Sequence, residues 1–197
     1  ADTGIKVEVI SGDLEAEIIY ENHIAEHLNK DHGYMYIDVG GGSTELNIYR
    51  NREKLASKSF KIGSVRLLEG TEKEGDWEKM RNWITTQKQL IPGEMEAIGT
   101  GGNMAKLFNL SKPAPEEKSM TFDALFDMAA YVGSFSFEDR VNKLRLNTDR
   151  ADVIVPAASI YLTAMELGGC KTILVPDLGL KDGILQMLYD RYLNRKK

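Results

Sequence analysis

The sequence predicts a mixed α/β fold in which helices cover both faces of one sheet. Three strand-like segments between residues 34 and 62 follow one another with short turns between them, which is the pattern of an antiparallel meander. Helical and strand-like segments then alternate along the rest of the chain. Of the 197 residues, 42% are hydrophobic and 28% are charged, the balance of an ordinary folded protein. We therefore expect a single domain over residues 1–197.

The first third of the chain predicts a strand, a helix and the meander. Residues 5–10 alternate apolar and polar side chains, as a strand does, and residues 11–28 begin with a serine suited to cap a helix. An apolar run over residues 34–38 indicates a buried strand. It ends in a glycine-rich turn, after which strand alternation resumes over residues 45–49. A polar turn then leads to a third strand over residues 55–62.

The middle of the chain predicts two helices, then a strand that leads into glycines and a third helix. Residues 65–68 start a short helix, and Asp76 is a suitable N-cap for an amphipathic helix that ends at Leu90. Residues 95–98 indicate a short buried strand, and a helix over 103–110 follows the glycines. The order of strand, glycines and helix makes this a second turn at which the backbone can approach a ligand closely.

The last third predicts a surface loop, four helices and one strand. Two prolines mark the loop over residues 111–118. The expected helices cover residues 121–132, 137–144, 151–167 and 179–193. Ser136 is placed to cap the second of these, and Pro156 is a candidate kink in the third. Residues 172–175 are rich in β-branched side chains and predict the last strand.

Charge and cysteine content exclude several classes of function. A net charge of −5 argues against a general binder of nucleic acid or of a membrane surface, whose footprint would be basic. Cys170 is the single cysteine, so no disulfide forms within the chain, which favours a reducing, cytoplasmic setting. No apolar run approaches the ~20 residues of a membrane span. The sequence begins with Ala1 directly before a predicted strand, and we expect it to be a piece of a longer protein.

The turn after the buried strand carries most of the functional information. It combines a carboxylate, three glycines and two hydroxyls: Asp38, Gly40, Gly41, Gly42, Ser43 and Thr44. Glycines without a Cβ let backbone N–H groups converge on an anion, and hydroxyls add further donors. A P-loop would end in Gly-Lys-Ser/Thr, and a dinucleotide-binding turn would show GxGxxG before a helix; neither is present here. We predict a phosphate-binding β-hairpin.

Two carboxylates are candidates for catalysis. Asp38 directly precedes Val39 and the glycines, where a carboxylate can hold Mg²⁺ or orient a water beside a bound phosphate. The alternative is a turn aspartate that caps its own backbone. Glu15 lies one turn into a predicted helix, where it can act as a general base or metal anchor, or simply complement the helix dipole. The residues alone leave these alternatives open.

A second glycine-rich turn and one arginine complete the set of candidates. The turn consists of Gly99, Thr100, Gly101 and Gly102. It offers a place for close approach to a nucleotide or phosphate, or it is a strand-to-helix turn that needs glycine. Arg66 near the start of a short helix is placed to reach a phosphate, although a solvated surface arginine has the same context.

Six segments in order resemble the exopolyphosphatase/guanosine pentaphosphate phosphohydrolase family. They cover residues 10–16, 37–45, 63–67, 99–102, 150–156 and 179–184. The resemblance implies a ribonuclease-H-like domain of the superfamily that contains actin, sugar kinases and heat-shock chaperones. It further implies hydrolysis of terminal phosphoanhydride bonds in polyphosphate or guanosine pentaphosphate, with Mg²⁺. This chain resembles the second of the family's two domains.

The resemblance also implies roles for single residues. Asp38 and residues 40–44 match the family's second phosphate loop, and Glu15 matches its catalytic or metal-associated glutamate. The family's first domain, with a glycine-rich loop of its own, has no counterpart in this sequence, so we expect a folded but catalytically poor C-terminal fragment. Lys181-Asp182 stands where the family usually has Arg-Glu, and Pro176 where a small polar residue is common, so substrate contacts there stay open.

Two other functions fit the same residues. One is a non-catalytic sensor of a nucleotide or alarmone that uses the same cleft, and the other is a sugar kinase or actin-like ATPase domain. The expected partners are polyphosphate or guanosine pentaphosphate and the missing N-terminal domain, without membrane or nucleic acid. A homodimer is also left open.

Overall fold

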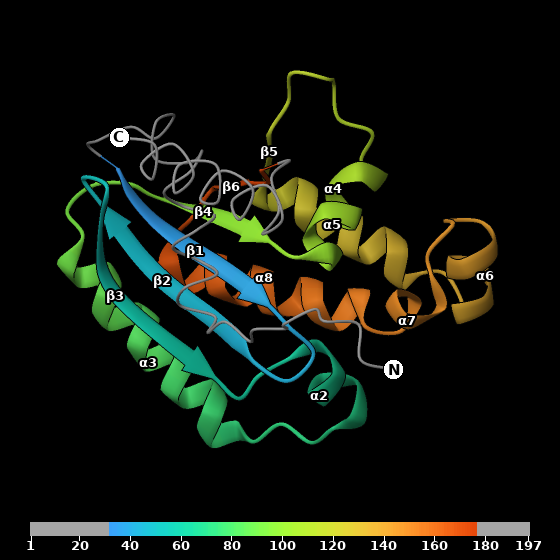
Figure 1. The fold of residues 1–197 in the computed structure, drawn as a ribbon, viewed down its shortest axis with the longest axis horizontal. Helices are drawn as coiled ribbons and strands as arrows, with labels where there is room; N and C mark the ends of the chain where they lie inside the picture. The colour runs from blue at the N-terminus through green and yellow to red at the C-terminus, as the bar shows by residue number, and fades with distance from the viewer. Residues whose placement is uncertain (1–31, 177–197) are drawn as a thin grey trace, which may run out of the picture. The chain divides into compact units, whose positions relative to one another are not determined.

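The computed structural model describes residues 32–176, which form one six-stranded mixed sheet packed against helices (Figure 1). The order of strands across the sheet is β3-β2-β1-β4-β6-β5. The elements expected at residues 5–10, 11–28 and 179–193 lie outside the described residues, as do Glu15 and Lys181-Asp182.

The strands confirm the predicted meander and its parallel continuation. Their bounds are β1 (Gly33–Val39), β2 (Thr44–Arg50), β3 (Glu53–Phe60), β4 (Met95–Thr100), β5 (Ser119–Thr121) and β6 (Thr172–Leu174). β1, β2 and β3 are antiparallel neighbours, whereas β4 runs parallel to β1, and β6 runs parallel to β4. Asn51 and Arg52 connect β2 to β3 with positive φ angles of 52° and 68°, the conformation that a tight hairpin requires.

The helices of the described part lie on one face of this sheet. They are α2 (Ser64–Glu69), α3 (Glu74–Leu90), α4 (Gly102–Leu110), α5 (Phe122–Gly133), α6 (Phe137–Asn142), α7 (Thr148–Ala151) and α8 (Ile154–Gly168). Figure 1 shows α3 and α8 side by side across the strands, and α8 also contacts α2, α4 and α5. The mixed α/β class is thus confirmed. The helices expected on the second face are not among the described residues.

The core forms between β1 and α8. Met35 and Ile37 project from one face of β1 and are fully buried with the apolar side of α8. Small residues let α8 approach closely, since a Cβ on its last residue, Gly168, would lie 2.8 Å from the Met35 methyl. Tyr34 and Tyr36 project from the other face of β1 and are also buried. A strand buried on both faces is expected at the centre of a sheet, and it fixes the position of the turn that follows β1.

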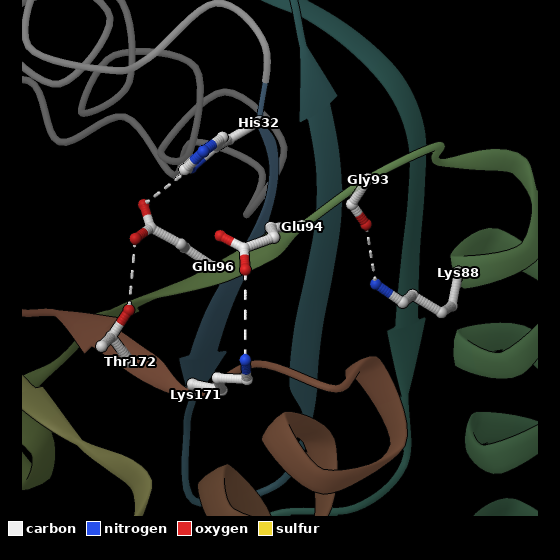
Figure 2. A network of polar contacts seen from close by, with 7 residues as sticks. All are labelled: His32, Lys88, Gly93, Glu94, Glu96, Lys171 and Thr172. Carbon is white, nitrogen blue, oxygen red and sulfur yellow. Dashed lines mark hydrogen bonds and ion pairs between the residues drawn. The ribbon is translucent and has the colours of Figure 1, made fainter.

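Polar contacts tie the strands together at the amino-terminal end of β4 (Figure 2). The Glu96 carboxylate accepts a hydrogen bond from Thr172 Oγ1 (3.3 Å) and lies 3.7 Å from His32 Nδ1, so one side chain joins β4 to β6 and to the residue before β1. Lys171 Nζ lies 4.0 Å from a Glu94 carboxylate oxygen nearby. These groups stand at the opposite end of β4 from its glycine-rich turn, which leaves that turn outside this network.

The start of α3 differs from the prediction. Lys73, not Asp76, occupies the N-cap position, and Asp76 lies inside the first turn. There its carboxylate accepts a hydrogen bond from Lys79 Nζ (2.9 Å), and this bond lowers the pKa of Asp76. The prediction failed because an aspartate suits both positions: it caps a helix, and it also complements the helix dipole within the first turn.

The predicted helix over 151–167 is two helices. α7 ends at Ala151 and α8 begins at Ile154, so Pro156 falls in the first turn of α8. N–H groups there have no partner within the helix, and a proline is tolerated without a kink. β5 was not predicted at all, because its three residues immediately precede α5 and carry too little alternation to be recognised.

In residues 32–176, no helix has the length and apolarity that crossing a membrane requires.

A single arginine joins the ends of α5 and α7. The Arg140 guanidinium donates hydrogen bonds to the carbonyls of Val132 (3.0 Å), Gly133 (3.3 Å) and Ala151 (3.0 Å). Carbonyls in the last turn of a helix have no partner within it, and the guanidinium supplies donors to them from outside. The Val132 carbonyl also accepts from the Phe135 N–H (3.3 Å). This charged donor also fixes the segment that leads into α8.

We expect Arg140→Ala to lower the free energy of unfolding by roughly 2 kcal/mol, because three charge-assisted hydrogen bonds to backbone carbonyls are lost. The matched control is Arg81→Ala, whose partner Glu74 is largely exposed and whose loss should cost about 0.5 kcal/mol. Urea unfolding of both variants measures the difference. Equal losses would contradict the assigned role of Arg140.

Candidate functional site

Two neighbouring parallel strands end at the same edge of the sheet and their connections then diverge. β1 and β4 pair in register as far as Asp38 and Thr100. β1 then turns back into β2, whereas β4 continues into α4. A crevice at the carboxyl ends of strands whose connections separate is the usual binding place in α/β sheets. Both predicted glycine-rich turns therefore lie at this edge.

The first turn is the predicted hairpin. Gly40 N–H donates to the carbonyl of Ser43 (2.9 Å), which closes the turn between β1 and β2. The three glycines are exposed, unlike the strand before them. The prediction of a strand, a tight glycine turn and a second strand is therefore confirmed.

The start of α2 holds the turn by its carbonyl groups. Ser64 N–H donates to the carbonyl of Gly40 (2.9 Å) and Val65 N–H donates to that of Gly41 (3.0 Å). Arg66 Nε donates to the carbonyl of Gly42 (2.7 Å). With these carbonyls engaged by α2, the orientation of each glycine peptide is fixed.

The amide groups of the same turn are left available. Among the described residues, the N–H groups of Gly41, Gly42 and Ser43 donate no hydrogen bond. Consecutive amides that are exposed, fixed and unpaired form a site for an oxyanion. The turn therefore presents donors to solvent while its acceptors face α2.

The two hydroxyls of the turn have structural partners. Ser43 Oγ donates to a Glu45 carboxylate oxygen (2.8 Å), and Thr44, fully buried, donates from Oγ1 to the carbonyl of Ile62 (2.7 Å). Thr44 thus anchors β2 to the segment before α2 and does not face open space. Its predicted role as a phosphate donor is corrected for that reason. Arg66 is half-buried, and its Nε likewise donates a hydrogen bond to the turn itself, at the Gly42 carbonyl.

The second turn meets the first. Gly101 has a φ of 89°, and a Cβ there would lie 3.0 Å from Asp38 Oδ1, so the Asp38 carboxylate lies against this glycine. The other half of the turn faces elsewhere. A Cβ on Gly99 would lie 2.6 Å from the Ile173 side chain, and Thr100 Oγ1 donates to the buried hydroxyl of Tyr36 (2.8 Å). Of the four predicted residues, Gly102 lines the cavity at this edge, and Gly101 lies against Asp38.

A cavity of about 210 Å³ lies where the two turns and two helices meet. Its lining comes from four segments of the chain: Val39, Gly40, Gly41, Ser64, Val65, Gly102, Asn103, Asp149, Arg150 and Val153. It is open to solvent, and its lining includes polar or charged residues: Ser64, Asn103, Asp149 and Arg150. The structure therefore brings together the first glycine turn, the end of the second and the segment before α8.

Arg150 and Asn103 are site residues that the individual motifs missed. The Arg150 guanidinium covers Gly102, since a Cβ there would lie 2.5 Å from one of its terminal nitrogens. Asn103 Oδ1 is buried and has no hydrogen-bond partner in the described part of the chain. The sequence signal that could have identified Arg150 is the segment over 150–156, one of the six that carry the family resemblance, to which no chemical role was assigned. Arg150 adds a positive charge to the cavity.

The Asp38 carboxylate lies against the second turn at this crevice. Within residues 32–176, no group of three or more His, Cys, Asp or Glu side chains gathers to hold a metal. Mg²⁺ is nonetheless commonly held by one or two carboxylates together with phosphate oxygens and water. Asp38 suits that mode of binding because it is half-buried beside the turn that presents free amides.

We expect Gly63→Ala to lower the free energy of unfolding by roughly 2 kcal/mol or more, because the new Cβ would lie 2.3 Å from the Gly41 carbonyl oxygen. Backbone cannot move aside there without breaking the bonds between α2 and the turn. Gly75→Ala is the control: it lies in α3 with nothing within 4 Å, and should be neutral or slightly stabilising. Thermal unfolding compares the two, and a Gly63→Ala protein as stable as Gly75→Ala would refute the close packing.

Two known proteins are similar in sequence to this chain over most of its length. The guanosine-5'-triphosphate,3'-diphosphate pyrophosphatase of Pseudoalteromonas translucida is 26% identical over 195 residues, which are 93% of this chain and 38% of that protein. Exopolyphosphatase 1 of Mycobacterium leprae is 22% identical over 209 residues, 93% of this chain and 60% of that protein. The chain thus spans less than two thirds of either relative.

Solved structures show the same fold. A crystal structure of an exopolyphosphatase from Cytophaga hutchinsonii matches with a TM-score of 0.71 and 26% identity, covering 94% of this chain and 66% of that one. The Aquifex aeolicus member of the Ppx/GppA family matches with a TM-score of 0.71 and 23% identity, covering 96% and 67%. The mixed sheet with its helices is therefore the actin-like ATPase fold. The sequence model of the Ppx/GppA phosphatase family matches residues 1–192, and the chain belongs to that family.

Proposed function

We propose that this chain is the second domain of a hydrolase that cleaves terminal phosphoanhydride bonds of polyphosphate or guanosine pentaphosphate. The observation that carries the proposal is the first glycine turn, whose carbonyls are held by α2 while the N–H groups of Gly41, Gly42 and Ser43 have no hydrogen-bond acceptor within residues 32–176. The names of the relatives, an exopolyphosphatase and a guanosine-5'-triphosphate,3'-diphosphate pyrophosphatase, support this class of substrate. A cytoplasmic location and a homodimer remain predictions.

The proposed chemistry follows from the groups around the cavity. The free amides would donate to oxygens of the terminal phosphate, where negative charge must be spread during phosphoryl transfer. Because α2 already holds the peptides, no reorganisation is needed when the charge develops. Arg150 beside Gly102 would add a cationic donor to the same phosphate or to the next one along.

Asp38 is the residue that would hold Mg²⁺, in company with substrate phosphates and water. Bound Mg²⁺ supplies charge neutralisation on the phosphate oxygens. The Asp38 carboxylate lies against Gly101, so it is placed between the two turns that the phosphates would contact. Glu15, which lies outside the described residues, is proposed to orient the attacking water as general base.

A non-catalytic sensor would use the same amides and the same arginine, and an actin-like ATPase or sugar kinase would transfer or release phosphate from ATP. Binding of a phosphate chain by itself therefore does not separate these functions. Release of phosphate does, because a sensor releases none and an ATPase acts on ATP in preference to polyphosphate or guanosine pentaphosphate.

We expect this chain alone to release little phosphate from polyphosphate, guanosine pentaphosphate or ATP, and the protein with an N-terminal domain restored to release it from one of the first two. The physical reason is that a single domain supplies donors from one side of the phosphate. A coupled assay for inorganic phosphate, with and without Mg²⁺, measures both forms. Turnover by the isolated chain would overturn its description as an inactive fragment, and ATP as the preferred substrate would overturn the proposed substrate class.

In the restored protein, Glu15→Gln should lower turnover by roughly 100-fold or more and leave the melting temperature unchanged, because removing a general base costs about that much. Asp13→Asn is the matched control: it removes a carboxylate two residues away that needs only a helix-dipole role. Steady-state phosphate release from the two variants decides the matter. Equal, small effects would remove Glu15 from the mechanism.

A further inference from the structure

A buried tyrosine joins the ends of the two strands on which the site is built. Tyr161 lies on α8 and is fully buried. Its hydroxyl accepts a hydrogen bond from Val39 N–H (3.3 Å) at the end of β1 and donates one to the carbonyl of Thr100 at the end of β4. Val39 immediately precedes Gly40, and Thr100 lies two residues before Gly102; both of these glycines line the cavity.

The hydroxyl takes the place of a bond between the strands. The last residue pair of the β1–β4 ladder is Asp38 with Thr100. If the ladder continued by one residue, Val39 would pair with Gly101. In a parallel ladder, Val39 N–H would then donate to the carbonyl one residue before its partner, which is that of Thr100. Gly40 N–H points to the β2 side, so Val39 N–H points to the β4 side as this bond requires. The tyrosine oxygen stands between that donor and that acceptor.

We propose that Tyr161 is a positioning residue that sets the separation of the two glycine turns. One direct bond of about 2.9 Å is replaced by two consecutive bonds through an oxygen atom, so the strand ends are held apart yet remain tied. The crevice opens at this level. The inference rests on the proposed function, because the spacing matters only if both turns contact one ligand.

The position of the Asp38 carboxylate depends on the same tyrosine hydroxyl. A Cβ on Gly101 would lie 3.0 Å from Asp38 Oδ1 and 3.6 Å from the Tyr161 hydroxyl, so the two side chains flank one glycine. Burial, and then the negative charge of Asp38, raises the pKa of Tyr161 well above its ordinary value. The hydroxyl therefore stays protonated, as it must to donate to Thr100. A shift of Gly101 would displace the carboxylate that faces it.

A phenylalanine would fill the same volume in the core, so the hydroxyl is needed only for the two backbone groups it joins. Tyr161→Phe is therefore the sharpest test. Tyr49→Phe is the matched control, because Tyr49 is 2% exposed in the same sheet but stands at the far end of β2 from the glycine turn.

The first measurement is amide hydrogen exchange of the chain. In the unaltered protein, Val39 N–H should be protected while Gly41 and Gly42 exchange quickly. In Tyr161→Phe, exchange at Val39 should rise at least 10-fold. Tyr49→Phe should leave it unchanged. Fast exchange at Val39 in the unaltered protein, or equal exchange in the two variants, would overturn the proposal.

The second measurement is phosphate release by the restored two-domain protein with inorganic triphosphate. Tyr161→Phe should lower kcat about 10-fold relative to Tyr49→Phe with a smaller change in KM, at similar melting temperatures. Equal kcat values in the two variants would refute the positioning role. If the unaltered protein releases no phosphate, the proposed function fails, while hydrogen exchange still decides whether Tyr161 ties the strand ends.

Discussion

The site depends on the hydrogen bonds by which the start of α2 holds the glycine turn. A run of glycines is flexible by itself, and its amides would be free to point in any direction. Ser64 and Val65 donate to the carbonyls of Gly40 and Gly41, and this fixes each peptide with its N–H group on the other side. Gly63, between β3 and α2, packs so closely against this turn that a Cβ there would lie 2.3 Å from the Gly41 carbonyl oxygen. The close packing of the turn therefore also requires glycine at position 63. The glycine turn, flexible by itself, is therefore held in one conformation in which its N–H groups are fixed as hydrogen-bond donors.

Much of the fold could be predicted from the sequence because its signals are local. The buried run before Asp38, the glycines and the alternation after them determined the hairpin without reference to anything distant. Ser136 likewise accepts from the Asp139 N–H as a helix cap should. Errors arose where one residue type serves two positions, as with Asp76 and Pro156, or where an element is too short to show a period, as with β5.

The sequence predicted only those parts of the candidate site whose residues are adjacent in the chain. The sequence placed both glycine turns after strands, but it could not show that Gly101 lies against Asp38 or that Arg150 covers Gly102. Such contacts depend on which strands are neighbours and on where α8 begins. The hydroxyl of Thr44 shows the converse: adjacency to glycines suggested a ligand contact, whereas its bond to the Ile62 carbonyl is structural.

Charge indicates how much of a phosphate site this domain can provide. With a net charge of −5, the chain does not attract a polyanion by its overall field, so an anion must be held by local donors. In the described part, the lining of the cavity contains the unpaired amide of Gly41 and the single cation of Arg150, opposed by the carboxylates of Asp149 and the nearby Asp38. A terminal triphosphate group carries several negative charges, which these donors only partly offset. Mg²⁺ beside Asp38 and cationic groups from a facing domain would supply the remainder, which is the physical reason for our proposal that catalysis needs both domains.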